Sequence, residues 1–537
     1  MLLSHKGQGK HRTIAGSKRL ATVPALIADA RRTDLLLFLV IFVTVFSATP
    51  LLVLGGAAIG FKYVLGGLLA LIAAILVVRW PLTGFYVIAG CVVLVEQEPL
   101  ATPIFTDQLP IFFWPAKLMG IPERPIGFLL LFILLVLICH RLLKRQRILW
   151  GGPLLLPFLC FMLCLVWGVV HGLTGGGDSH IIVLEVRPFW YLFVAYLLAY
   201  NLISQKRQLR AFLWVVILGA GVKALQGVYI YFVVLHTNLI GHHEILSHEE
   251  SFFFVAVLLL LILFWLHHCY RPQMWAIVLI SPALLVALAA NQRRTDYVAL
   301  LAGIGVAVVL IFWLKPAARK RLVVLALCSL VLGTGYVLAF SHSTGAIGEP
   351  ARAITSLIHP DPTDTVSAAS DLYRIIEDYD LKYTVKQDPL LGWGFGKPFL
   401  QPVTLPNIIT LDPYYLYVPH NTIYWVWMRL GAIGYAVMWY LFGACMVRGC
   451  LIARKLRDPY LQVIAIFVIA VTVMEIIVAL ADYQLFFYRN VLYVGLLFGV
   501  LMRLSALDEG AGKEQPVYEA AYRLGEPAKS SVGSQRA

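Results

Sequence analysis

The chain has 537 residues, of which 60% are hydrophobic and only 13% are charged, and its mean hydropathy is +0.81. Soluble domains carry about a quarter of charged residues, so this composition excludes a large water-soluble core. The formal net charge of +14 does not indicate nucleic-acid binding. Lys and Arg gather in short segments between apolar runs, as they do in the cytoplasmic loops of membrane proteins. We therefore predict an all-α polytopic membrane protein that binds no nucleic acid.

Apolar runs of the length that a helix needs to cross a bilayer recur along the whole chain. A basic tail, 1–34, precedes them without a clear cleavage site, so we expect it to be retained. About 12 to 14 spans are expected, with a bundle at 35–341, a polar loop at 342–419, a second bundle at 420–503 and a polar tail at 504–537. The predicted spans are 35–56, 60–79, 82–97, 126–143, 153–171, 187–204, 211–235, 251–268, 275–291, 295–314, 322–341, 421–447, 460–481 and 488–503.

Charge alternates between the loops. Basic clusters at 141–147, 206–210, 315–321 and 448–457 fall on one face, together with both tails. The positive-inside rule makes this face cytoplasmic. The polar loop 342–419 is then extracytoplasmic, and so are the shorter loops on its side. We expect a cytoplasmic (inner) membrane protein with both termini in the cytoplasm.

Three arginines break this charge pattern on the outer face. Arg187 stands where a span begins, and Arg293 and Arg294 stand where two spans meet almost without a loop. Guanidinium groups at the membrane edge are costly unless they are paired or hydrated. They could simply snorkel or pair with Glu185 and Asp296. Because all three share one face and arginine suits bidentate binding of phosphate, we favour anion binding.

The polar loop contains a stretch, 371–381, whose apolar residues follow helical spacing. We expect this helix to pack on the membrane surface or to cap the bundle. The glycine-rich run 388–396 follows it. No strand precedes this run and no Lys-Ser/Thr follows it, so we interpret it as a tight turn that lets backbone approach the site, and not as a nucleotide-binding loop.

His420 stands at the outer end of the next span, and Asn421 can cap the helix that follows. A histidine in this place is often only an interfacial or capping residue. Neutral imidazole is nevertheless the side chain best suited to accept a proton near neutral pH. Since His420 lies on the same face as the arginines, we treat it as a candidate catalytic residue.

A second histidine group lies in the predicted outer loop 236–250 and comprises His236, His242, His243 and His248 with three glutamates. This density permits a divalent metal, but the spacing fits no particular site, and a hydrated acidic loop is preferred. The eight cysteines all lie in or beside apolar runs, which gives no disulfide framework. We predict neither a metal nor a cofactor.

Taken in order, these motifs resemble those of the O-antigen ligase and O-antigen polymerase superfamily, which uses undecaprenyl-diphosphate-linked glycans outside the cytoplasmic membrane. The resemblance covers about residues 180–440. Its matching elements are Arg187, the run Gln292-Arg293-Arg294-Thr295, Arg374, the turn Pro389-Leu390-Leu391-Gly392-Trp393-Gly394 and the pair His420-Asn421.

The resemblance implies a membrane glycosyltransferase fold of type C and a metal-independent, inverting transfer. It implies catalytic roles for three residues, His420, Arg294 and Arg187, and substrate-binding roles for five, Arg293, Arg374, Asn421, Gly392 and Gly394. The donor would be an undecaprenyl-diphosphate-linked oligosaccharide and the acceptor a glycan or lipid A-core. Two positions depart from the family pattern. Arg293 replaces a small residue, and Arg429 stands where Glu is common, so that a partner such as Asp482 is expected.

Several functions share these motifs. Ligation to lipid A-core, polymerisation of repeat units and transfer to protein all fit, and we favour polymerisation weakly and protein transfer least. A transporter or flippase is the alternative from another class. It predicts charges near mid-bilayer and an internal repeat, but Lys223 is the one clear mid-span charge and no repeat is evident. We therefore favour an enzyme.

Overall fold

The computed structural model of the protein describes residues 61–97, 106–109, 111–113, 123–239, 244–343, 348, 351–352, 355, 365–408 and 413–523. The chain divides into two compact units, Met1–Ile72 and Ala73–Ala537. Of the first unit only 61–72 are described, which form the beginning of one helix. Apart from the beginning of α3, all of the features below lie in the second unit.

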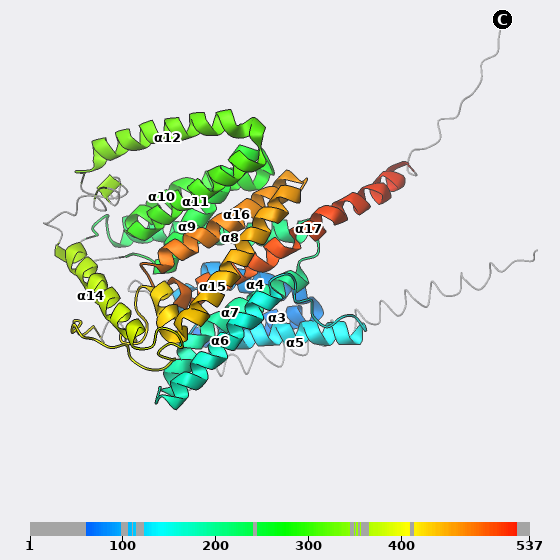
Figure 1. The fold of residues 1–537 in the computed structure, drawn as a ribbon. Coiled ribbons are helices and arrows are strands. Elements are labelled where there is room, and N and C mark those ends of the chain that lie inside the picture. Colours follow the sequence, from blue (N-terminus) through cyan, green and yellow to red (C-terminus); the bar gives the residue numbers. More distant parts are fainter. Residues whose placement is uncertain are drawn as a thin grey trace, which may run out of the picture. The chain divides into compact units, whose positions relative to one another are not determined.

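The described part of the chain folds into helices and contains no strand. The longer helices are α3 (Phe61–Arg79), α4 (Pro81–Leu94), α5 (Pro125–Leu143), α6 (Leu155–Thr174), α7 (Ser179–Leu202), α8 (Lys206–Tyr229), α9 (His248–His267), α10 (Arg271–Ala290), α11 (Arg294–Leu314), α12 (Arg319–Phe340), α14 (Thr365–Gln387), α15 (Thr422–Lys455), α16 (Pro459–Ala479) and α17 (Tyr488–Arg523). Short helical turns are η1 (Thr106–Gln108), η3 (Ile230–Val234), η4 (Pro316–Ala318) and η5 (Gln484–Phe486). Figure 1 shows their arrangement.

Eleven of the described helices are long and apolar enough to cross a membrane. They coincide with the eleven spans predicted from 126–143 onward, which confirms the all-α polytopic fold. The predicted spans 60–79 and 82–97 correspond to α3 and α4, and α4 has only 14 residues. The predicted span 35–56 lies outside the described residues.

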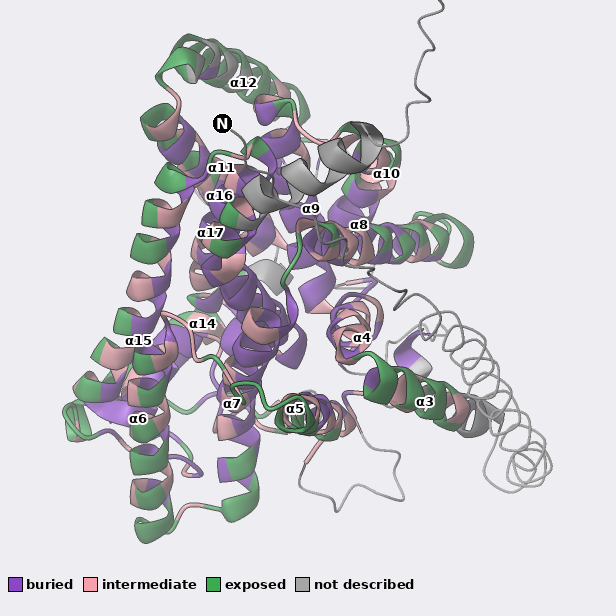
Figure 2. Cartoon of the chain, turned by 90° about the vertical axis from the view of Figure 1, so that its right-hand side faces the viewer, coloured by how far each residue is buried: buried purple, intermediate pink, exposed green. Residues whose placement is uncertain are grey.

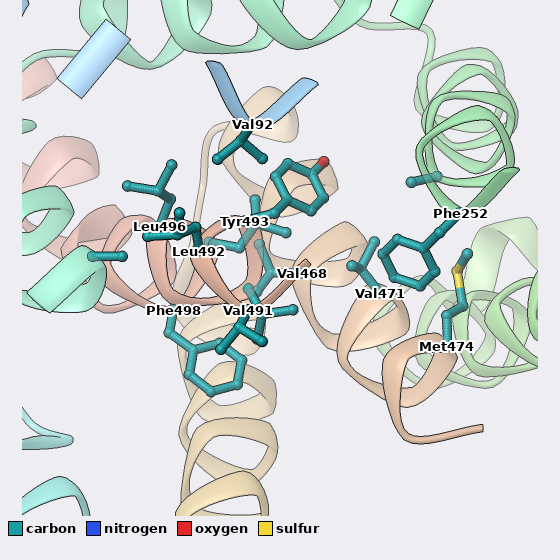
Figure 3. Packing of buried hydrophobic residues seen from close by; sticks show 14 of the residues in the cluster. Val92, Phe252, Val468, Val471, Met474, Val491, Leu492, Tyr493, Leu496 and Phe498 are labelled. Atoms are coloured by element: carbon teal, nitrogen blue, oxygen red, sulfur yellow. The ribbon is translucent and has the colours of Figure 1, made fainter. Parts of the chain in front are cut away.

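The centre of the bundle is formed by helices that are apolar on every side. In α16 and α17, 83% of the most apolar stretch is buried, against 6% in α12, so the first two lie inside and α12 lies at the rim. The contrast is visible in Figure 2. Val468 of α16 packs near Val491 and Leu492 of α17 in the core, and Val471 lies beside Phe252 of α9 (Figure 3). A helix that is hydrophobic all round suits either the protein core or lipid, so the packing of the bundle decides which of these helices are buried.

One end of the bundle carries the polar features that matter for function. There α9, α11, α15 and α17 begin and α16 ends, and α14 runs across this end against α15 (Figure 1). We call it the α14 end. Asn421 caps α15 by accepting a hydrogen bond from the backbone N–H of Tyr424 at 3.1 Å, which satisfies one of the free donors of the first turn.

Candidate functional site

His420 is held by α14. The carboxylate of Glu377 accepts hydrogen bonds from the backbone N–H of His420 at 2.9 Å and from its ring Nδ1 at 3.1 Å. Glu377 is buried, and the imidazole is also stacked on Tyr483, with ring centroids 4.4 Å apart. A carboxylate only accepts, so the Nδ1 contact assigns the ring proton to Nδ1. This tautomer leaves Nε2 as the nitrogen that can accept a proton.

Arg293 is bound by Asp482, which directly precedes the Tyr483 that stacks on His420. Its Nη2 donates to Oδ2 of Asp482 at 2.8 Å, and Nδ1 of His248 lies 3.5 Å from the same oxygen. Burial raises the pKa of Asp482, but the positive charge of Arg293, its hydrogen bond to Asp482 and the positive charge of Arg374 hold the pKa below its usual value. Asp482 is therefore an anion that balances several cations at the α14 end.

The turn 482–488 between α16 and α17 links these residues to Arg187. Asp482 contacts Arg293, and Tyr483 contacts His420. At the end of the turn, the Tyr488 hydroxyl accepts a 2.7 Å hydrogen bond from Nη1 of Arg187. Three motifs that are far apart in the sequence thus meet on one short turn.

Arg187 itself is buried in α7. Its Nε lies 3.8 Å from a carboxylate oxygen of Glu123, and the guanidinium stands over the Tyr488 ring, 5.6 Å from its centroid. The Tyr191 hydroxyl donates to the same carboxylate. The expected alternative partner, Glu185, instead pairs with Arg429. Arg187 is therefore placed by a tyrosine and a carboxylate that come from other elements.

The two remaining arginines stand close to the same turn. Arg294 is partly buried in the first turn of α11, directly after Arg293. Arg374 projects from α14, where its Nη1 lies 3.9 Å from Asp371, and its charge acts on Asp482. Both have the position that the sequence analysis predicts, and their roles in binding stay predictions.

Asn421 joins α14 to α15 a second time. Besides capping α15, its side-chain amide donates to Oδ1 of Asp378 at 3.1 Å. Burial raises the pKa of Asp378, and the hydrogen bond from Asn421 and the charge of Lys382 oppose this. Two consecutive acidic residues of α14 therefore accept hydrogen bonds from two consecutive residues before α15: Glu377 from His420, and Asp378 from Asn421.

Most of the predicted site residues lie in one segment that matches a known family. Residues 279–439 match the family model of the O-antigen ligase domain. This segment belongs to the O-antigen ligase/polymerase superfamily. The matched segment contains every predicted site residue except Arg187, and it does not include the turn 482–488. No curated protein matches the chain.

The glycine turn of this ligase domain packs against helix backbone. Gly392 and Gly394 have φ values of +86° and +79°, which favour glycine. A Cβ on Gly394 would stand 2.7 Å from the backbone nitrogen of Gly172 in α6. The turn fits beside a break in α15 at Gly431, where φ is +66°. The geometry gives these glycines a packing role, and their predicted role in substrate binding stays a prediction.

Arg429 holds this turn, and the expectation that it pairs with Asp482 is wrong. Its guanidinium is fully buried, forms an ion pair with Glu185, and donates to the backbone carbonyls of Gly394 at 2.9 Å and Lys397 at 2.7 Å. Glu185 in turn accepts from the backbone N–H of Gly396 at 2.6 Å. The guanidinium thus satisfies carbonyls of the glycine turn, which a Glu at this position could not do. The carbonyls of Met428 and Arg429 at the break in α15 accept from the backbone N–H groups of Trp393 and Gly394.

Lys223 belongs to a buried charge network, and it is not the one charge inside the bundle. It forms ion pairs with Glu96 and Glu250, and Arg489 lies 2.7 Å from Glu250. All four side chains are fully buried. Two cations therefore face two carboxylates among α8, α9, α17 and the segment after α4, which favours a structural role for Lys223 over a place in a transport path.

The histidine group of the outer loop is dispersed in the structure. His248 lies 2.9 Å from Glu244 and close to Asp482, whereas His236 is exposed. His242 and His243 lie outside the described residues. Across the described ranges, no group of three or more His, Cys, Asp or Glu side chains could hold a metal ion.

Sequence analysis missed the partners of the predicted residues. Glu377, Tyr483, Tyr488 and Glu123 carry no motif, and they reach the site only through the packing of α14, the turn 482–488 and the start of α5. The helical spacing of α14 gave a weak signal for Glu377. This residue lies on the face opposite the exposed apolar residues, and a carboxylate buried there needs a hydrogen-bond partner.

Proposed function

We propose that the chain is a membrane glycosyltransferase that moves an undecaprenyl-diphosphate-linked oligosaccharide onto an acceptor glycan or lipid A-core. The observation that carries this proposal is the gathering of His420, Arg293 and Arg187 on the turn 482–488. Transfer from a diphosphate leaving group needs a proton acceptor and guanidinium groups in one site, and here all three residues contact the same turn.

In the proposed reaction His420 is the general base. The acceptor hydroxyl gives its proton to Nε2 as its oxygen forms a bond to the anomeric carbon of the donor. The bond between that carbon and the phosphate oxygen breaks, and the electron pair leaves with the diphosphate. Glu377 fixes the ring through Nδ1 and stabilises the imidazolium that forms. Attack opposite the leaving group inverts the anomeric carbon, and the chain's own residues supply each of these roles.

The arginines balance the charge of the leaving diphosphate. The order of the motifs supports Arg294 and Arg187 as phosphate ligands, and the contact of Arg293 with Asp482 at 2.8 Å supports a positioning role for Arg293. Arg293 then positions Asp482 and, through the turn, Tyr483 and His420. Guanidinium groups bind phosphate through two parallel hydrogen bonds, so geometry matters as well as charge.

The proposal places the α14 end outside the cytoplasm, on the periplasmic side of an inner membrane. The basic clusters at the other end of the spans support this side, because short cytoplasmic loops are rich in Lys and Arg. Both termini are then cytoplasmic. A lipid-linked diphosphate would meet the site at the level of the headgroups.

Alanine substitutions test the proposal. Arg187→Ala, Arg294→Ala and His420→Ala should each abolish glycan chain growth or ligation at unchanged membrane abundance, with lipid-linked donor accumulating on the outer face. Arg294→Lys should also fail if bidentate contact is required. His180→Ala is a matched control, because His180 is exposed in the first turn of α7. Donor accumulating on the cytoplasmic face would instead identify a flippase.

A further inference from the structure

Helix α14 buries polar residues and exposes large apolar ones, unlike a helix that simply packs on a protein core. Beside the buried Leu381 and Val385, its inward face carries three polar residues with at most 1% exposure, Glu377, Asp380 and Thr384. Its outward face carries a stripe of large apolar residues at Leu372, Ile375, Tyr379 and Tyr383, which are 57%, 67%, 55% and 40% exposed. Their spacing of three and four residues puts them on one side of the helix.

The inward polar face has its partners inside the protein. Glu377 receives two hydrogen bonds from His420. Oδ1 of Asp380 accepts from the backbone N–H of Val403 at 3.2 Å, and the Thr384 hydroxyl accepts from that of Leu400 at 2.9 Å. Since these bonds fix which side of α14 faces the protein, the apolar stripe must face away from it.

The apolar stripe is continuous with the membrane-facing end of α15. The Nζ of Lys382 stands 5.2 Å from the ring centroid of Tyr424, and Tyr424 is stacked on Trp427. The indole of Trp427 donates to the carbonyl of Pro389, next to Leu390 and Leu391, which are 64% and 43% exposed. Tyrosine and tryptophan gather where a span leaves the hydrocarbon region.

We propose that α14 is an interfacial helix whose stripe, Leu372, Ile375, Tyr379 and Tyr383, lies in the lipid of the leaflet at the α14 end. Bilayer lipid is the occupant because α14 packs on the first turns of a membrane span, and lipid surrounds that span wherever protein does not. An interfacial helix has an apolar face in the acyl boundary and a polar face away from it. Here the polar face is turned to the site.

Lipid contact then has a consequence for the site. The same helix presents apolar side chains to lipid and Glu377 to His420. Seating α14 on the leaflet therefore keeps the carboxylate against the imidazole at the depth of the headgroups. This inference concerns where α14 lies, and it holds or fails independently of the reaction proposed above.

Cysteine accessibility in proteoliposomes tests the proposal on the full chain. Ile375→Cys and Tyr379→Cys are compared with Asp371→Cys and Gln387→Cys, which are exposed on the two flanks of the same helix. The unsubstituted chain, with its eight native cysteines, gives the background. The vesicles contain phosphatidylcholine and phosphatidylglycerol, and the probe is a membrane-impermeant maleimide. Each labelling rate is normalised to the final extent of labelling, because the reagent reaches only those protein copies whose α14 end is on the outside of the vesicle.

The two stripe cysteines should react at least about tenfold more slowly than the two flank cysteines, because the polar reagent does not enter the acyl boundary. Equal rates at all four positions would place the stripe in water and overturn the proposal. A nitroxide spin label attached at position 375 or 379 distinguishes a stripe covered by lipid from one covered by protein. In lipid the label should collide with oxygen, which dissolves in the bilayer, but not with a polar nickel chelate. Shielding from both reagents would mean that protein covers the stripe, and this result would also overturn the proposal.

Discussion

Replacing Glu377 by glutamine tests the proposed base most directly. In the structure Oε2 of Glu377 accepts both the backbone N–H and the ring Nδ1–H of His420, at 2.9 and 3.1 Å, while Oε1 lies 3.3 Å from Nδ1. A glutamine can keep both bonds through its single oxygen, but it loses the charge and turns an N–H group towards Nδ1. The difference between a charged and a neutral hydrogen bond is about 1–2 kcal/mol, or about a 5- to 30-fold fall in transfer rate.

Glu377→Ala leaves both donors of His420 without their acceptor, so its loss should be larger, about 100-fold or more. The assay is transfer by purified protein in proteoliposomes, with rates measured across pH. Glu377→Gln should also move the acid limb of the profile to lower pH, because the imidazolium loses its counter-charge. Lys386→Gln, exposed on the same helix, should leave rate and profile unchanged. A wild-type rate and profile in Glu377→Gln would refute the role of Glu377 in holding the base.

Three further predictions concern stability, measured by thermal unfolding of the detergent-purified protein. Lys223→Met should destabilise by about 3–5 kcal/mol, because it leaves the buried Glu96 without its cation and Glu250 with Arg489 alone, and adding Glu96→Gln should recover part of the loss. Gly394→Ala should cost about 2 kcal/mol or more, since φ is +79° and the Cβ meets backbone, whereas Gly443→Ala, with open space around it, should be neutral or stabilising. The lowered pKa of Asp482 means that its ion pairs contribute fully above about pH 4 and are lost as pH falls through the lowered pKa. Asp482→Asn should therefore lower stability at neutral pH and reduce the acid dependence, and an unchanged difference between the two proteins from pH 7 to pH 3 would contradict this.

The spans could be predicted from sequence because hydrophobic length is a local property. A run of about twenty apolar residues needs no partner to be recognised as a span, and eleven predicted spans appear as helices. The same holds for the cap at Asn421, since a capping side chain acts within its own first turn. The shorter α4 and the break at Gly431 depend on neighbours, and the sequence analysis did not resolve them.

The pairing of charges could not be predicted in this way. Arg429 was expected to find Asp482, but Asp482 faces Arg293 and Arg429 faces Glu185. Several cations and carboxylates lie at helix ends with similar local context. Which of them meet depends on the rotation and depth of whole helices, and an ion pair forms only within a few ångströms.

By itself the sequence determined the class of the protein, the positions of most helices, the superfamily and the residues to examine, because all of these depend on composition, periodicity and ordered motifs. Only the tertiary structure brought His420, Arg293 and Arg187 together on the turn 482–488 and supplied Glu377 from α14. It also turned the apolar side of α14 outward. These features join residues separated by tens to hundreds of positions, so helix packing decides them and local pattern does not.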